Sequence, residues 1–98
     1  MIVYVAHKYN GEKDNIEKAR RILRHLQMID RDNCYVCPLT AFEHLAHKEI
    51  GQDLRDAVRL DLLSVCDMLL IASNVTDEMR QEIEFAKLVG MEVEHFEG

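Results

Sequence analysis

Glu82 is the residue whose type and position most readily suggest chemistry. It lies roughly one turn into the last helix that the sequence predicts, where the helix macrodipole favours the ionised form of a carboxyl group. An ionised glutamate acts as a nucleophile or base rather than as an acid. The alternative is an ordinary surface glutamate, because the same helix also carries Glu78 and Glu84. Spacing alone leaves both open.

Tyr4 is the second candidate, because it sits inside a short apolar run, Ile2-Val3-Tyr4-Val5-Ala6. Such a run predicts a strand that is buried on both faces. A buried phenol needs a hydrogen-bond partner, and a carboxylate across a neighbouring loop would suit. The alternative is a core tyrosine whose hydroxyl meets water.

Three polar segments follow predicted strands, at residues 7–11, 38–44 and 74–82. In a doubly wound sheet, ligands bind beyond the carboxyl ends of the strands, where the strand order reverses. His7 and Lys8 in the first segment could meet a phosphate or a sugar, or else only solvent. These segments are the expected binding edge.

Metal and cofactor sites are not expected from the remaining motifs. His44 and His47 are three residues apart, but no third ligand is placed with them at metal spacing. Cys34 and Cys37 fall in an apparent strand, which points their side chains to opposite faces, and with Cys66 they are interpreted as reduced core or near-core thiols. The sequence contains neither G-x-G-x-x-G nor a P-loop. We therefore expect no metal and no cofactor.

The elements that must position Glu82 and Tyr4 follow from the apolar periodicity. Strands are expected at residues 2–6, 34–37, 68–73 and 91–96, and helices from a cap at Asn10 or Gly11 to about Met28, over 51–65, and from the stretch 74–77 to Gly90. Residues 40–48 form a short helix or an ordered loop. The order predicts an α/β fold: a small doubly wound parallel sheet of about four strands, flavodoxin-like or Rossmann-like, with helices on both faces.

Two helices have predicted inner faces. In the helix over residues 51–65 this face consists of Leu54, Val58, Leu62 and Val65. In the last helix it consists of Met79, Ile83, Ala86 and Val89.

Length and composition predict a single domain over residues 1–98. The net charge of -6 argues against a nucleic-acid partner, and the one basic cluster, over residues 18–24, lies on a helix that also carries acids and is interpreted as a solvated face. The longest apolar run, residues 68–72, is far shorter than the roughly 20 residues of a membrane span, and no signal sequence is recognisable, so we expect a cytoplasmic protein. Small size makes a homo-oligomer a reasonable expectation.

With these elements in place, a set of motifs spans nearly the whole chain. They are Ile2-Val3-Tyr4-Val5-Ala6, Tyr9-Asn10-Gly11 with Asn15-Ile16-Glu17-Lys18-Ala19, Cys37-Pro38 before Ala41-Phe42, Leu60-Asp61-Leu62-Leu63 running into Cys66-Asp67, and Met79-Arg80-Gln81-Glu82-Ile83-Glu84-Phe85-Ala86 with Gly90. The chain thereby resembles the nucleoside 2-deoxyribosyltransferase superfamily, especially its small phage and bacterial members. The last motif is the most specific, because it looks like the superfamily's Glu-x-x-x-Ala-x-x-x-Gly helix.

The resemblance implies that Glu82 is the nucleophile and that Tyr4 orients it. Glu82 would attack the anomeric carbon of a 2′-deoxynucleoside or its 5′-monophosphate and form a glycosyl-enzyme intermediate. A second base or water would complete transfer or hydrolysis, and Asp61 or Asp77 could protonate the departing base. The residues expected to contact the substrate are His7, Lys8, Tyr9, Gly11, Pro38 and Met79. In the superfamily, a neighbouring subunit completes the site.

Two alternatives stay open. The superfamily usually has a Ser-x-Gly-like stretch before the nucleophile, whereas this chain has Thr76-Asp77-Glu78, whose two acids would repel a 5′-phosphate. That difference favours a module that binds a nucleotide derivative without turnover. The second alternative is an oligomerising structural protein whose helix faces only pack.

Overall fold

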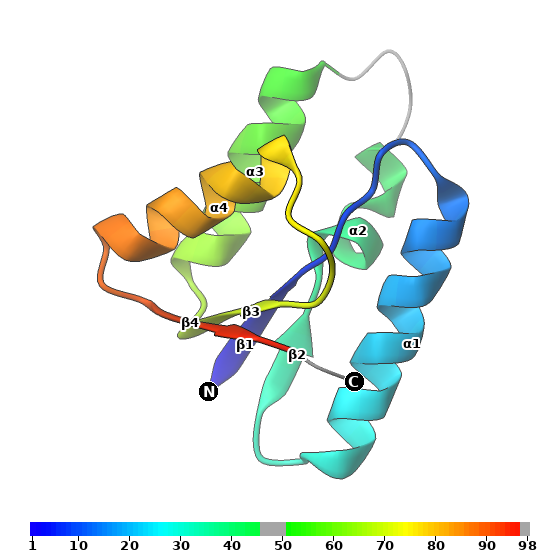
Figure 1. Ribbon diagram of the computed structural model, residues 1–98, viewed down its shortest axis with the longest axis vertical. Coiled ribbons are helices and arrows are strands. Elements are labelled where there is room, and N and C mark those ends of the chain that lie inside the picture. The colour runs from blue at the N-terminus through cyan, green and yellow to red at the C-terminus, as the bar shows by residue number, and fades with distance from the viewer. Residues whose placement is uncertain (46–50, 97–98) are drawn as a thin grey trace.

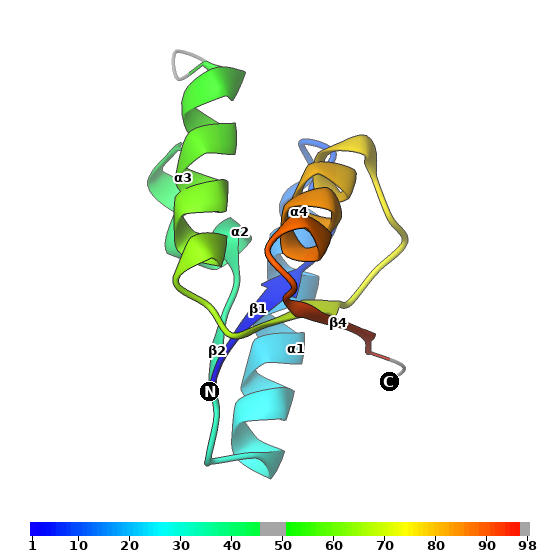
Figure 2. The ribbon, with the colours of Figure 1, turned by 90° about the vertical axis from the view of Figure 1, so that its left-hand side faces the viewer.

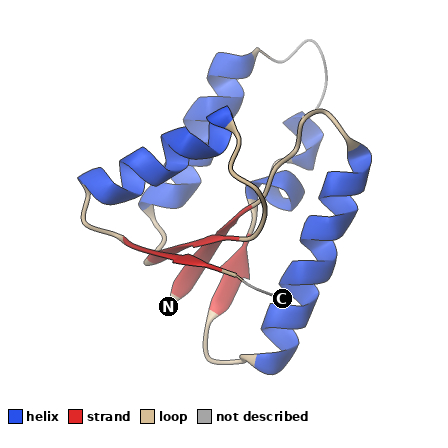
Figure 3. Cartoon of the chain, viewed as in Figure 1, coloured by secondary structure: helices blue, strands red, loops and turns tan. Residues whose placement is uncertain are grey.

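Four parallel strands form one sheet in the computed structural model, which describes residues 1–45 and 51–96 (Figures 1 and 3). The strands are β1 (Ile2–Ala6), β2 (Cys34–Val36), β3 (Met68–Ile71) and β4 (Glu92–His95). The helices are α1 (Lys13–Ile29), α2 (Pro38–Ala41), the 3-10 helix η1 (Glu43–Leu45), α3 (Gln52–Ser64) and α4 (Asp77–Leu88). No described helix has the length and apolar character that crossing a membrane requires.

The strand order is β2-β1-β3-β4, so β1 lies in the middle of the sheet. Tyr4 pairs with Val36 on one side and with Leu69 on the other. The chain moves outward from β1 to β2 and then returns to the other side of β1 for β3. The strand order therefore reverses between β1 and β3, where the general rule for this architecture places ligands.

The two faces of the sheet carry separate halves of the core. Tyr4 and Ala6 face α3 and α4, and pack in one cluster with Leu63, Met79 and Ala86. The alternate β1 residues, Val3 and Val5, pack on the other face with Ala19 and Leu26 of α1. Figures 1 and 2 show α1 on one side of the sheet and both α3 and α4 on the other. The predicted doubly wound α/β fold with helices on both faces is confirmed.

Helix α1 begins later than the sequence predicts. Its N-cap is Glu12, not Asn10 or Gly11. Asn10 and Gly11 have φ values of 53° and 70°, which form a left-handed turn, whereas an N-cap residue needs extended backbone. Within the predicted segment 40–48, the structure has the end of α2 followed by η1, and residues 46–48, including His47, lie outside the described residues.

The inner face of α3 differs from the prediction. Leu54 and Val65 are 51% and 65% exposed, whereas Arg59 and Leu63 are buried. The buried stripe is therefore displaced around the helix, because a charged residue occupies an inward position. In α4 the prediction fails only at Val89, which is 56% exposed because it is the C-cap.

Candidate active site

Tyr4 and Glu82 meet in the interior, between β1 and α4. Both side chains are buried, with 0% and 2% of their surface exposed. The Tyr4 hydroxyl donates a hydrogen bond to Oε2 of Glu82. Tyr4 reaches Glu82 because alternate β1 residues face α3 and α4, and because Glu82 is on the inward face of α4 with Met79 and Ala86.

Arg59 of α3 is the cation of this site. Its Nη1 lies 3.4 Å from Oε1 of Glu82, and its Nη2 pairs with Asp56 one turn earlier in the helix. Nη1 also donates to the backbone carbonyl of Glu78 at 3.4 Å. The chain Tyr4–Glu82–Arg59–Asp56 thus joins β1, α4 and α3 through polar contacts that are buried at Tyr4 and Glu82 and partly buried at Asp56.

Burial raises the pKa of Glu82 from its ordinary 4.5 to about 7, although the Tyr4 hydrogen bond and the positive charge of Arg59 both lower it. Desolvation therefore opposes the helix macrodipole, from which the sequence predicts an ionised carboxylate. Near neutral pH both protonation states are populated. Burial, followed by the charge of Glu82, raises the pKa of Tyr4, so the phenol stays protonated and can donate.

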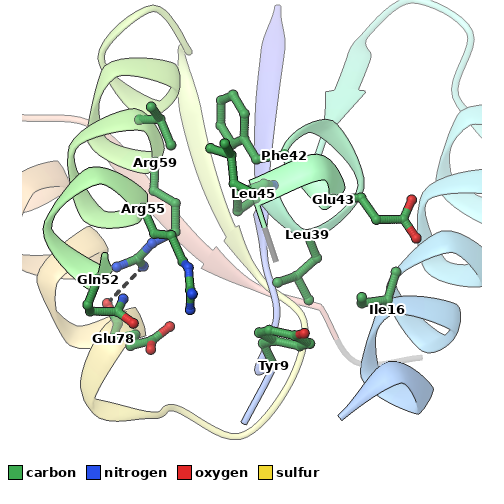
Figure 4. A pocket seen from close by; sticks show the side chains of 12 residues that line it. Tyr9, Ile16, Leu39, Phe42, Glu43, Leu45, Gln52, Arg55, Arg59 and Glu78 are labelled. Carbon is green, nitrogen blue, oxygen red and sulfur yellow. Dashed lines mark hydrogen bonds between the residues drawn. The ribbon is translucent and has the colours of Figure 1, made fainter. Parts of the chain in front are cut away.

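A pocket lies beside this chain, at the carboxyl ends of β1 and β2 (Figure 4). One wall is polar and comes mainly from α3, with Gln52, Arg55 and Arg59, together with Glu78. Figure 4 shows Leu39, Phe42 and Leu45 across from it, with Tyr9 between them. The remaining lining residues are Ile16, Pro38, Glu43 and Val58. Each of the three segments nominated from the sequence contributes at least one lining residue.

Residues 1–96 match the protein family described as a domain of unknown function (DUF7768). The chain belongs to this family. No curated protein and no solved structure matches the chain significantly. The DUF7768 match includes β1, α3 and α4, so the buried Tyr4–Glu82–Arg59 chain lies within the family domain.

The first loop of this DUF7768 domain contributes to the pocket only through Tyr9. His7 is buried, its pKa is lowered by burial, and its Nδ1 donates to the carbonyl of Lys8 at 2.8 Å. The backbone N–H of Lys8 donates to Ser73 at 2.8 Å. Gly11 supplies the left-handed turn before α1. His7, Lys8 and Gly11 are therefore expected substrate residues that do not line the pocket, whereas Tyr9 and Pro38 do.

The other expected site residues of the DUF7768 domain lie on different faces of their helices, some exposed to solvent and one in the core. Asp61 is exposed on α3, and Asp77 is exposed in the first turn of α4, where it pairs with Arg80 at 3.5 Å. Met79 is 2% exposed and belongs to the core. None of these three lines the pocket, so Asp61 and Asp77, the two expected acids, lie outside its wall. The α4 residue that does line it is Glu78.

Sequence reasoning missed Arg59, since its signal in the sequence is only its helical spacing from two apolar residues, which does not show that it is buried. Arg59, Leu63 and Cys66 are spaced by four and three residues, which is helical spacing, and all three are buried. An inner helix face that is predicted from apolar residues alone cannot include an arginine. Among the described residues, no cluster of three or more histidine, cysteine, aspartate or glutamate side chains could hold a metal ion.

Proposed function

We propose that this domain cleaves or exchanges the N-glycosidic bond of a 2′-deoxynucleoside or its 5′-monophosphate, with Glu82 as nucleophile. The observation that carries the proposal is the buried hydrogen bond from Tyr4 to Glu82. It matches the roles that the resemblance to nucleoside 2-deoxyribosyltransferases assigns to these two residues. A pocket with one polar and one largely apolar wall suits a ligand with a sugar and a flat base.

The chemistry needs Glu82 in its ionised form. One carboxylate oxygen attacks C1′ of the sugar, and the C1′–N bond breaks with its electron pair leaving on the base, which takes up a proton. Water or a second base then attacks C1′, and the ester bond to Glu82 breaks and restores the carboxylate. The Tyr4 hydroxyl holds Oε2 of Glu82, so Oε1, which lies 3.4 Å from Nη1 of Arg59, is the oxygen that would react.

The proton for the departing base must come from an acid that reaches the pocket. Glu43 and Glu78 are the carboxyl groups that line it. Both carboxylate oxygens of Glu43 accept hydrogen bonds from Nη2 of Arg20, at 2.7 Å for Oε1 and 2.6 Å for Oε2. We therefore assign the acid role to Glu78, in place of Asp61 or Asp77.

Base release tests the proposal. The protein is incubated separately with deoxynucleosides and with their 5′-monophosphates, and free base is measured by chromatography. We expect release by the wild type, loss of release in Glu82→Ala, and a decrease of about 10²-fold or more in Glu78→Gln, the typical range for general acid catalysis. Glu84→Ala, an exposed position on the same helix, should behave as wild type. Release that survives Glu82→Ala would contradict the proposal.

Binding without turnover is the second candidate, and the burial of Glu82 favours it. A nucleophile with 2% of its surface exposed cannot contact a substrate without a rearrangement. In this case a nucleoside or nucleotide would raise the melting temperature while no base appears in solution. Loss of that rise in Tyr9→Ala, which alters the pocket but not Glu82, would locate the binding.

A further inference from the structure

Arg59 touches both the pocket and the buried carboxylate. It lines the pocket, whereas Glu82 does not, and its Nη1 lies 3.4 Å from Glu82. Only 8% of Arg59 is exposed. A molecule in the pocket therefore meets the guanidinium before it meets Glu82.

The contacts of the guanidinium are uneven. Nη2 makes a close ion pair with Asp56, while Nη1 is shared, at 3.4 Å each, between Glu82 and the carbonyl of Glu78. Nε is buried and has no hydrogen-bond partner in the part of the chain that the structure describes. The contacts of Nη1 with Glu82 and Glu78 are longer than the contact of Nη2 with Asp56. A movement of Arg59 that keeps the ion pair with Asp56 therefore breaks only the longer contacts.

We propose that Arg59 is a positioning residue that shields Glu82 from the pocket, and that a ligand reaches the carboxylate by drawing the guanidinium away while Asp56 holds it. An acceptor oxygen on the ligand would take the hydrogen bond that Nε does not make. The withdrawal of this counter-ion would make the Glu82 carboxylate more basic, because Arg59 lowers its pKa, and would reduce the fraction that is ionised near neutral pH. The proposal rests on the proposed function only where it treats Glu82 as the group that the ligand must reach.

The groups around Glu82 determine what each substitution should do to its ionisation. Tyr4 from β1 and Arg59 from α3 lower the pKa of Glu82, whereas Glu78 of α4 and Asp56 of α3 raise it. The thiol of Cys37, after β2, also lies within electrostatic range, and burial raises its pKa to about 12, so it is neutral. Removal of Arg59 and removal of the Asp56 charge should therefore act in opposite directions.

Two measurements test the proposal without turnover. Carbon-13 NMR of glutamate-labelled protein, assigned by comparison with Glu82→Gln, gives the titration midpoint of Glu82. Coupling of a small amine by a carbodiimide at about pH 5, where Glu82 is protonated, reports access to the carboxyl group. The variants are Arg59→Met, Arg59→Lys and Asp56→Asn. Arg80→Met is the control, because it removes the same charge from an exposed site.

We expect Arg59→Met to raise the midpoint by about one pH unit or more and to speed labelling of Glu82 severalfold. Arg59→Lys restores the charge and should keep the midpoint near that of the wild type. Asp56→Asn should lower the midpoint, because it removes a negative charge that raises the pKa of Glu82. Arg80→Met should change neither quantity.

Wild-type midpoint and labelling in Arg59→Met would overturn the proposal. If Arg59→Met does not fold, Asp56→Asn decides, since a midpoint that rises or stays constant contradicts the proposal. If the titration midpoint and the labelling rate of Glu82 change as expected but no base is released, the role of Arg59 as a shield stands. The proposed function is then refuted. The two proposals can therefore fail separately.

Discussion

At the scale of single residues, Glu82 carries a conflict between folding and reactivity. Burial favours its protonated form, and the proposed chemistry requires its ionised form. Tyr4 and Arg59 reduce the conflict without removing it. Such a carboxyl group, with a pKa near the working pH, is typical of functional sites.

The first prediction concerns stability against pH. The pKa of Glu82 is about 7 in the folded protein and near 4.5 when unfolded, so this group contributes stability that is complete below pH 4.5 and lost as the pH rises to about 7. The neutral Glu82→Gln should match the wild type at pH 4.5. At pH 8 it should be more stable by about 3 kcal/mol. Denaturant unfolding at the two pH values measures the difference, and Glu84→Gln should show none.

The second prediction concerns the phenol. Tyr4→Phe removes the hydrogen bond that lowers the pKa of Glu82 and leaves a buried oxygen without its donor. We expect a loss of about 1–3 kcal/mol in the free energy of unfolding and a higher titration midpoint of Glu82. Unfolding and carbon-13 titration measure the two effects. An unchanged midpoint would show that the hydroxyl does not act on the carboxyl group.

The Tyr4–Glu82 pair could be predicted from the sequence, but Arg59 could not be ranked with it. Tyr4 and Glu82 are distinctive where they stand, one in an apolar strand and one in a recognisable motif. Arg59 is an ordinary residue in a charged helix, and its inward position becomes visible only when the carboxylates of Asp56 and Glu82 are placed around it. Its buried charge depends on Glu82, which lies in another helix and far away in sequence.

At the scale of elements, α4 has sequence signals at both ends. Thr76 accepts a hydrogen bond from the N–H of Met79 at 3.3 Å as the N-cap. Gly90 has φ of 77°, and the bonds from Gly90 to the Lys87 carbonyl and from Met91 to the Ala86 carbonyl complete a Schellman motif. These signals are local, so the end of the helix at Gly90 could be predicted from the sequence.

The third prediction follows from that end. Gly90→Ala should cost about 1 kcal/mol of stability, because an added Cβ disfavours the left-handed backbone although it meets no neighbour. Gly51→Ala is the comparison, since Gly51 has φ of −65°, and its loss should be smaller because it comes only from the place of Gly51 as the N-cap of α3. Thermal or denaturant unfolding compares the two. Equal losses at both positions would contradict the conformational explanation.

At the scale of the whole molecule, the fold could be predicted because each strand and helix has its own apolar periodicity. Right-handed crossovers then leave few strand orders, and β2-β1-β3-β4 is one of them. The pocket could be predicted only as an edge of the sheet, because its shape depends on how α2, η1 and α3 pack. Residues that are far apart in sequence, such as Tyr9 and Arg59, line it together.

The fourth prediction is self-association, which remains an expectation from the small size of the chain. The helices on one side of the sheet leave large apolar side chains exposed, including Leu54 and Val65 of α3 and Leu88 and Val89 at the end of α4. Sedimentation equilibrium should give a mass of at least twice the 11.4 kDa of one chain. Leu88→Lys should weaken an association that uses this surface. A monomer at high concentration would contradict the expectation.

The central claim is that Glu82 becomes covalently bound to the sugar, and a trapped intermediate tests it most directly. The protein is mixed with deoxynucleosides or their 5′-monophosphates, quenched after a short time, digested and analysed by mass spectrometry. We predict a deoxyribosyl ester, or its 5′-phosphate, on the peptide that contains Glu82, and no such adduct in Glu82→Gln. Released base without an adduct on Glu82, or neither base nor adduct with any of these substrates, would contradict the claim.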